Sequence, residues 1–277
     1  MAAARRLQRL LDHQRPPQPH RDATATPTAA GHLQQPKRDW CAAPFRTVVA
    51  LGESTTAGGW STSPERCWVS QLGKLLNDFL PQPCDVINSG IGANLVSSSS
   101  PNYEQSGKPA ADIRLQKHVI DHRPDLVLLS YGLNDARGGT TIPHFVASLR
   151  SLITRLRESP SPPLVLLMGP YHMTAEGFAG HGDTWAHADI STFHEFNNAT
   201  AALAAEEDCL FADVLNANGG TDWMVHFDGV HANDVGHAIA AQEVFRTLAQ
   251  NCSCIASATQ EAERTSPRWR DESVLVA

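Results

Sequence analysis

The chain has 277 residues, which is enough for one large domain with a sizeable buried core. Its formal net charge is −7, and residues 41–254 contain 12 basic and 22 acidic residues, a net charge of −10. An acidic body argues against nucleic acid as the main partner. No apolar stretch approaches the roughly 20 residues that a membrane-spanning helix requires, so we expect no membrane span.

Residues 1–40 differ in composition from the rest of the chain. They contain seven Lys or Arg residues and five prolines against three acidic residues, with few large apolar side chains. Such a segment cannot bury enough apolar surface to offset the entropy lost on ordering. The sequence therefore predicts a disordered basic tail over residues 1–40, a folded domain over residues 41–254 and a second disordered tail over residues 255–277.

The first eleven residues bear on localisation. They are rich in arginine and lack acids, as an organelle transit segment does, but prolines soon interrupt any helix there. The apolar residues at positions 7–11 are too few for a signal-peptide core, so we expect a cytoplasmic protein. Of the six cysteines only Cys252 and Cys254 are close together, and without a second pair they predict free thiols rather than a zinc site.

From Thr47 onward, short apolar runs alternate with longer amphipathic stretches, which is typical of strand–helix units in a parallel sheet. Apolar residues follow helical spacing over residues 68–79 and 145–156, and Asn233 is expected to cap a last helix. We expect a three-layer α/β/α sandwich with a mostly parallel, flavodoxin-like sheet of about five strands. The candidate strands are residues 47–51, 85–88, 126–131, 164–168 and 210–214.

Polar residues follow these candidate strands where ligands bind in open parallel sheets, beyond the carboxyl ends. Ser54 follows the first strand, and residues 90–94 follow the second. Residues 132–135 follow the third strand, and a loop with Asp228 and His231 comes after the fifth. We therefore expect one crevice to collect all of them.

Ser54, His231 and Asp228 have the chemistry of a nucleophile, a base and an orienting carboxylate. A serine hydroxyl is a weak nucleophile until an imidazole accepts its proton, and the imidazole needs an acceptor that fixes its tautomer. Asp228 precedes His231 by three residues, so both side chains fit on one short loop. This spacing alone is a local hint at a catalytic triad.

Four separated motifs resemble those of the SGNH hydrolases, also called the GDSL esterase/lipase family, in the family's order. Residues 52–55 read Gly-Glu-Ser-Thr where the family has Gly-Asp-Ser, and residues 88–93 are similar to its Asn-x-Gly-x-x-Gly. Residues 132–135 match Gly-x-Asn-Asp, and residues 228–231 read Asp-Gly-Val-His. The resemblance covers roughly residues 47–250.

The resemblance implies hydrolysis of a carboxylic ester, an acyl or acetyl ester of a small molecule or glycan, through an acyl-enzyme and without a cofactor. The catalytic residues would be Ser54, His231 and Asp228. The oxyanion would accept hydrogen bonds from the Ser54 N–H, the Ala93 N–H and the Asn134 side chain. Oligomeric state, acyl chain and alcohol are not predicted.

Two residues depart from the family's motifs. Glu53 replaces the usual aspartate, and its longer side chain is expected to change the hydrogen bonds around Ser54. Ala93 stands where the family has glycine, so the backbone donor is retained, but the methyl group restricts φ or crowds the acyl pocket. Gly92 is the nearest substitute donor.

Other functions remain open at this point. An α/β-hydrolase is disfavoured because Thr56 replaces the last glycine of Gly-x-Ser-x-Gly, and a phosphate-binding loop is disfavoured because no Lys-Ser/Thr pair follows the glycines. An acyltransferase would use the same triad. A non-catalytic carbohydrate- or acyl-binding module is left open by Glu53 and Ala93.

The segment 171–194 is rich in histidine and glycine. It lacks the compact spacing of metal ligands, so we expect no metal site. Residues 177–182 fit a mobile loop on the substrate side, and Trp60, Phe178 and Trp185 are candidates for lining the substrate pocket, with core packing as the alternative. The candidate metal ligands in the segment are His172, His181, Asp183, His187 and His194.

Overall fold

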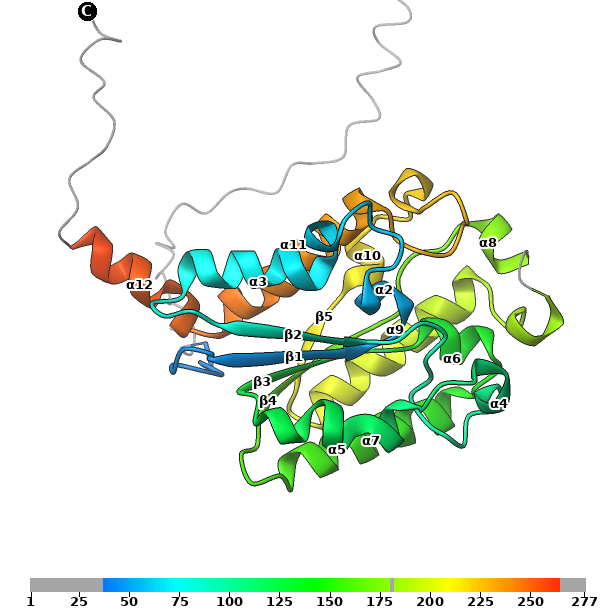
Figure 1. Ribbon diagram of the computed structural model, residues 1–277, viewed down its shortest axis with the longest axis horizontal. Coiled ribbons are helices and arrows are strands. Elements are labelled where there is room, and N and C mark those ends of the chain that lie inside the picture. The colour runs from blue at the N-terminus through cyan, green and yellow to red at the C-terminus, as the bar shows by residue number, and fades with distance from the viewer. Residues whose placement is uncertain (1–36, 180–181, 265–277) are drawn as a thin grey trace, which may run out of the picture. The chain divides into compact units, whose positions relative to one another are not determined.

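The computed structural model describes residues 37–179 and 182–264. Within these residues lies a sheet of five parallel strands in the order β2-β1-β3-β4-β5. The predicted three-layer fold is confirmed, because helices cover both faces of this sheet (Figure 1). The strands are β1 (Thr47–Gly52), β2 (Asp85–Gly90), β3 (Leu126–Ser130), β4 (Leu164–Met168) and β5 (Leu210–Ala212).

The three central strands are continuous apolar runs because both of their faces are covered. Strands β1, β3 and β4 are almost entirely buried, whereas β2 lies at an edge and is partly exposed. Strand β5 is shorter than predicted and ends at Ala212. Its expected continuation is interrupted because the Asp213 side chain accepts the Asn216 N–H at 3.1 Å and caps a short helix.

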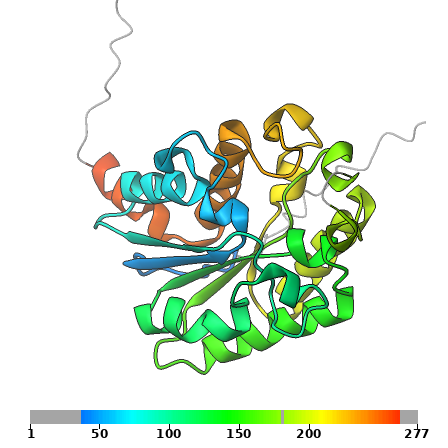
Figure 2. The same cartoon turned by 45° about the vertical axis from the view of Figure 1, so that its right-hand side comes forward.

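Helices cover both faces of the sheet in the described part of the chain (Figures 1 and 2). None of the described helices is long and apolar enough to cross a membrane. One layer contains α3 (Trp68–Phe79), α11 (Asp234–Asn251) and α12 (Cys254–Glu263), and the other α5 (Ala111–His118), α7 (Ile142–Arg157) and α9 (Ile190–Glu206). Shorter helices are α2 (Ser54–Ala57), α4 (Tyr103–Ser106), α6 (Leu133–Arg137), α8 (Ala175–Ala179), α10 (Val214–Ala217), η1 (Pro64–Arg66), η2 (Ile120–His122), η3 (Asp183–Trp185) and η4 (Asp222–Met224).

The packed domain extends beyond both predicted boundaries. Helix α12 continues past residue 254, where a tail was expected, and buries Cys254 and Ile255 in the core. At the other boundary, the Asp39 carboxylate accepts the Ser253 N–H at 2.9 Å, and the Trp40 N–H donates to the carbonyl of Asn251 at 2.8 Å. The remainder of the two predicted tails, residues 1–36 and 265–277, lies outside the described residues.

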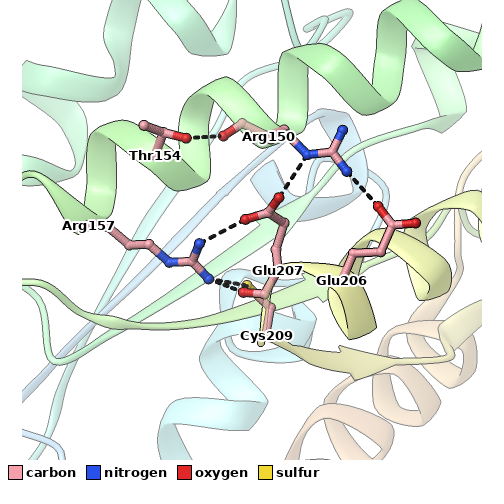
Figure 3. Close-up of polar contacts among 6 residues, drawn as sticks. All are labelled: Arg150, Thr154, Arg157, Glu206, Glu207 and Cys209. Carbon is pink, nitrogen blue, oxygen red and sulfur yellow. Dashed lines mark hydrogen bonds and ion pairs between the residues drawn. The ribbon is translucent and has the colours of Figure 1, made fainter.

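Charged side chains join α7 to the end of α9 (Figure 3). The Arg150 guanidinium donates to Glu206 at 2.6 Å and to Glu207 at 2.7 Å, and Arg157 donates to the other oxygen of Glu207 at 2.8 Å. These pairs are partly exposed, so each contributes little stability alone, but the shared carboxylate makes them a network. The network holds in place the short segment that connects the end of α9 to the start of β5.

Asn233 caps helix α11, as predicted, and also holds the preceding loop. Its Oδ1 accepts the N–H groups of Val235 and Gly236 at 3.0 and 3.2 Å. Its Nδ2 donates to the carbonyls of Trp223 and Val225 at 2.8 and 3.2 Å. One side chain therefore joins the N-terminus of α11 to the end of η4, across the loop that separates them.

Replacing Asn233 by alanine should lower the free energy of unfolding by about 1–2 kcal/mol, because helix N–H groups and loop carbonyls lose their partner. Urea unfolding of wild type and Asn233→Ala measures this change. Asn198→Ala is the matched control, since Asn198 is exposed in the interior of α9. Equal stability losses in the two variants would contradict the assigned role of Asn233.

Candidate functional site

Ser54 is the first residue of α2 and follows the end of β1 after one residue, Glu53. The turn requires glycine at two places. A Cβ on Gly52 would lie 2.2 Å from Oγ1 of Thr56, and a Cβ on Gly90 would lie 2.1 Å from the backbone nitrogen of Ala57. The two glycines therefore allow α2 to pack against the ends of β1 and β2, with Ser54 at the carboxyl edge of the sheet.

Asp228 and His231 lie on a tight loop between η4 and α11. Inside the loop, the His226 N–H donates to the carbonyl of His231 at 2.7 Å, and the Gly229 N–H donates to the carbonyl of His226 at 2.9 Å. From the segment after β4, the Thr174 N–H donates to the carbonyl of Gly229 at 3.0 Å. These bonds hold the loop against its neighbour and leave both side chains free to face Ser54.

The structure brings Ser54, His231 and Asp228 into one line of hydrogen bonds. His231 Nε2 lies 2.8 Å from Ser54 Oγ, and His231 Nδ1 lies 2.6 Å from Asp228 Oδ2. The other carboxylate oxygen, Oδ1, accepts the N–H groups of Val230 and His231 at 3.0 and 3.1 Å. The arrangement has the geometry of a nucleophile, its base and the acceptor that orients the base.

The surroundings push the pKa values of the acid and the base in the directions that this chemistry requires. Burial alone would raise the pKa of Asp228, but hydrogen bonds from His231 and from two backbone N–H groups hold it below its usual value. Burial lowers the pKa of His231, and Asp228 opposes that effect only in part. Near neutral pH the imidazole is therefore uncharged and able to accept a proton.

Trp60 stacks on the imidazole of His231. The ring centroids are 3.4 Å apart and the planes differ by 5°. The loop that contains Trp60 is tied to the start of α11, because Asp234 accepts the Thr62 N–H at 2.8 Å and the Thr62 hydroxyl at 2.6 Å. The indole thus covers one face of the imidazole and limits rotation of the ring.

Three candidate hydrogen-bond donors belong to residues that line the pocket beside Ser54 Oγ. Within the described part of the chain, no acceptor occupies the N–H of Ser54 or Ala93. The Asn134 side chain donates one N–H to the carbonyl of Asn94 at 3.3 Å, which leaves its second N–H free. Ser54, Ala93 and Asn134 line the same pocket with His231.

Ala93 adopts the backbone conformation for which glycine is usual. Its φ is +55°, in the left-handed region, which costs a residue with a Cβ about 1 kcal/mol. Its carbonyl accepts the Ser106 hydroxyl at 2.6 Å, which helps to hold this conformation. Ala93 therefore adopts the glycine-like conformation at the cost of local strain, and its N–H remains available as a donor beside the pocket.

Glu53 is buried, with 1% of its surface exposed, and it bridges two loops. Its two carboxylate oxygens accept the backbone N–H groups of Leu133 and Asn134 at 3.0 and 2.8 Å. The longer side chain thus reaches the first turn of α6, which contains Asn134. Glu53 positions Asn134 relative to Ser54, a role that the sequence did not indicate.

Glu53 and Asp135 form a buried acidic pair. Burial, reinforced by the charge of Asp135, raises the pKa of Glu53 to about 8, although two backbone N–H groups oppose the shift. Burial likewise raises the pKa of Asp135 to about 7, against hydrogen bonds from the Val96 N–H and the Ser100 hydroxyl. Both groups therefore bind protons more tightly in the folded protein than in an unfolded chain.

Sequence reasoning missed Arg114, which joins the ends of three strands from a position on α5. Its guanidinium is buried and donates to the carbonyl of Ser89 at 2.6 Å and to that of Gly52 at 2.9 Å. It also donates to Asn94 Oδ1 at 3.0 and 3.2 Å and to the Tyr131 hydroxyl at 3.1 Å. An arginine at one position in a polar amphipathic helix gives no sequence signal for such a role.

The pocket beside Ser54 has a volume of about 240 Å³. Two of the predicted aromatic residues, Trp60 and Trp185, line it together with Arg137, a residue that sequence reasoning did not single out. The third, Phe178, does not line this pocket. Its ring packs edge-on against Phe193 with centroids 4.8 Å apart, which is the core-packing alternative.

The histidine-rich segment has structural contacts in its described part. His172 Nε2 lies 2.8 Å from Asp222 Oδ1, and residues 180 and 181 lie outside the described part. Much of the expected mobile loop is helix α8, in which Gly177 packs directly against the backbone of Gly229. Within residues 37–179 and 182–264, no three His, Cys, Asp or Glu side chains are grouped as metal ligands.

The acidic pair predicts how stability depends on pH. Because the pKa values of Glu53 and Asp135 are raised in the folded protein, the stability that their protonation contributes is lost as pH rises through about 7 and about 8. The free energy of unfolding should therefore fall between about pH 6.5 and 8.5. Buried His231 and His237 have lowered pKa values and act in the opposite direction only below 6.5.

Urea unfolding at several pH values in this window measures the slope. Asp135→Asn should flatten it, because one acid is removed and the pKa of Glu53 falls with it. Asp78→Asn, an exposed change on α3, is the control and should leave the slope unchanged. A stability that rises with pH in the wild type, or the same slope in Asp135→Asn, would contradict the assignment.

Comparison with known proteins places the chain among ester hydrolases. The GDSL-like Lipase/Acylhydrolase family model matches residues 50–239. A lipase/acylhydrolase from Enterococcus faecalis superposes with a TM-score of 0.57 at 22% identity, over 73% of this chain and 95% of that one. An acetylxylan esterase from Geobacillus stearothermophilus superposes with a TM-score of 0.55 at 22% identity, over 73% of this chain and 94% of that one.

At this identity the two structures show a common fold. For the Geobacillus esterase, variants that replace a serine, an aspartate or a histidine are described as catalytic mutants. No curated protein sequence matches the chain. The family match spans more than half of the sequence and includes all four motifs. The protein therefore belongs to the GDSL-like lipase/acylhydrolase family.

Proposed function

We propose that this protein hydrolyses a carboxylic ester through an acyl-enzyme formed on Ser54. The observation that supports this most directly is the line of hydrogen bonds from Ser54 Oγ through His231 to Asp228 at the wall of a pocket. Family membership supports ester hydrolysis in general. The geometry of the site supports a more specific proposal, in which each step of the hydrolysis is assigned to a named residue.

In the first half of the reaction, Ser54 Oγ attacks the ester carbonyl carbon as His231 Nε2 accepts the hydroxyl proton. The carbonyl oxygen becomes an oxyanion and accepts hydrogen bonds from the Ser54 N–H, the Ala93 N–H and the free N–H of Asn134. The intermediate collapses when the bond to the alcohol breaks, and His231 returns its proton to the leaving oxygen. The acyl group remains on Ser54.

In the second half, a water molecule takes the place of the alcohol. His231 accepts a proton from the water, whose oxygen attacks the acyl carbon, and the same three donors stabilise the second oxyanion. Collapse releases the carboxylic acid and returns the proton to Ser54. Asp228 holds the tautomer with Nδ1–H throughout and stabilises the imidazolium that forms in each half.

The pocket favours a short acyl group. Its volume of about 240 Å³ lies below the range of about 300–1,000 Å³ typical of pockets for drug-sized ligands. Trp60, which stacks on His231, and Trp185 both line the pocket and limit its size. A structural neighbour is an acetylxylan esterase, which supports acetyl esters as the first substrates to test.

Substitutions at Ser54 and Asn134 should have unequal effects on 4-nitrophenyl acetate hydrolysis. Ser54→Ala or His231→Ala should lower kcat by about 10⁴- to 10⁶-fold, because either change removes the activated nucleophile. Asn134→Ala should cost about 10²- to 10³-fold, as expected for one oxyanion donor. Initial rates of the purified proteins at saturating ester measure both effects.

Ser151→Ala and Asn198→Ala are the matched controls for these changes. Both residues are exposed on the outer helices α7 and α9 and should leave kcat within about twofold of wild type. Retention of wild-type turnover by folded Ser54→Ala would contradict the mechanism. The absence of turnover by the wild type on acetyl, butyryl and longer esters would contradict ester hydrolysis itself.

A further inference from the structure

Arg137, the last residue of α6, lies in the pocket wall and is almost fully buried. It is 6% exposed and lines the pocket together with Ser54, Trp185 and His231. Its guanidinium has no hydrogen bond or ion pair with any residue in the described ranges. Its Nε is sealed from solvent and unpaired, so the remaining exposure belongs to other atoms of the residue.

A guanidinium without a hydrogen-bond acceptor is unusual in this environment, because a buried charge is costly unless it is paired and hydrogen-bonded. Arg114 in the same domain is equally buried, and its guanidinium donates hydrogen bonds to four different residues. The two guanidinium groups thus differ in the hydrogen-bond acceptors that surround them. Arg114 holds the fold together, whereas the described residues offer the Arg137 guanidinium only the distant Trp185 ring and no hydrogen-bond acceptor.

The nearby carboxylates are already engaged elsewhere. Glu53 accepts two backbone N–H groups of α6, and Asp228 accepts from His231 and its own loop. Among the described residues, no carboxylate oxygen lies within 4.0 Å of the Arg137 guanidinium. Burial lowers the pKa of Arg137, while the charges of Glu53 and Asp228 act to raise it from a distance.

The wall around Arg137 is built to hold a ligand. The guanidinium carbon lies over the Trp185 ring, 6.0 Å from the ring centroid, and both residues line the pocket. The loop with Trp185 is fixed to the domain, because the carbonyl of Thr184 accepts the Asn102 side chain at 2.7 Å and the His187 N–H donates to the carbonyl of Arg137 at 3.1 Å. A planar cation and an aromatic ring therefore face the space beside Ser54.

We propose that Arg137 binds an anionic group of the ester substrate, a carboxylate or a phosphate, and makes the enzyme selective for charged esters. This inference rests on the proposed hydrolysis at Ser54 and names its substrate class. The planar guanidinium fork matches the two oxygens of a carboxylate or phosphate, and entry of such a group satisfies the buried cation. A neutral ester of the same shape leaves the Arg137 guanidinium without a hydrogen-bonded anion.

The test compares charged and neutral esters of the same shape. One pair has the charge on the acyl side, 4-nitrophenyl hydrogen glutarate and the corresponding glutaramate ester, with the enzyme-free rate subtracted. A second pair has the charge on the alcohol side, 2-acetoxypropanoate and 2-acetoxypropanamide. The measured quantity is the ratio of kcat/KM for the charged ester to kcat/KM for the neutral ester, in wild type, Arg137→Gln and Arg137→Lys.

The wild type should prefer the charged member of one pair by at least about tenfold, and that pair tells which side of the ester bears the anion. Arg137→Gln should lower this preference by about 10- to 100-fold, as expected for loss of a charge-assisted hydrogen bond. Arg137→Lys should retain part of it, because the charge remains without the planar fork. Arg264→Gln removes an exposed charge just after the end of α12 and should leave the ratio unchanged.

Three results would overturn the proposal: no charge preference in either pair, a preference that survives in Arg137→Gln, or an equal loss on both members of a pair. Ser54-dependent hydrolysis of neutral esters without charge preference would reject the role of Arg137 alone. If the wild type hydrolyses none of these esters and no 4-nitrophenyl acetate, the proposed hydrolysis fails and this inference fails with it.

A measurement on the wild type covers the case in which Arg137→Gln does not fold. Glutarate or inorganic phosphate should inhibit 4-nitrophenyl acetate hydrolysis competitively, whereas uncharged glutaramide should not. Stronger inhibition by one of the two anions identifies carboxylate or phosphate as the preferred group. Equal inhibition by glutaramide, or none by either anion, would contradict the proposal.

Discussion

The buried guanidinium of Arg114 fixes the carboxyl ends of the strands, and the rest of the site depends on that constraint. It donates to the carbonyl of Gly52, the last residue of β1, and to that of Ser89 in β2. It also donates to the hydroxyl of Tyr131, directly after β3. Strand-end carbonyls that leave the ladder need new donors. Because one planar side chain supplies donors to two such carbonyls and to the Tyr131 hydroxyl, the three loops that follow these strands begin from fixed positions.

Glu53 extends this constraint into the oxyanion donors. It precedes Ser54 directly, and its carboxylate binds the N–H groups of Leu133 and Asn134. The nucleophile and the asparagine amide are thereby held at a set separation before any substrate arrives. Donors fixed in advance need no reorganisation when charge develops, which is the main source of oxyanion stabilisation. The glutamate at this position is therefore compatible with the proposed chemistry.

The base reaches the nucleophile from the opposite end of the chain. His231 lies 177 residues after Ser54 in the sequence, yet Nε2 and Oγ are 2.8 Å apart. The contact is secured from several sides: by the Asn233 cap on α11, by the Thr174 N–H from the segment after β4 and by Trp60 stacked on the imidazole. Each comes from a different element, so the geometry of the site requires the whole fold.

The sequence predicted what depends on local pattern. Continuous apolar runs marked the strands, and motif spacing placed Ser54, Asn134, Asp228 and His231 near one edge of the sheet. The helices α5, α9 and α12 were missed, because α5 is mostly polar and many apolar positions of α9 and α12 are alanine. Arg114 and Arg137 were indistinguishable in sequence, since only tertiary packing decides which buried guanidinium is satisfied.

The central claim is that His231 activates Ser54, and labelling with diisopropyl fluorophosphate followed by peptide mass spectrometry tests it most directly. The reagent phosphorylates serine only where the hydroxyl is activated. The account predicts a single adduct on the peptide that contains Ser54, and no adduct there in folded His231→Ala. An adduct on another serine with Ser54 unmodified, or equal labelling of Ser54 in His231→Ala, would contradict it.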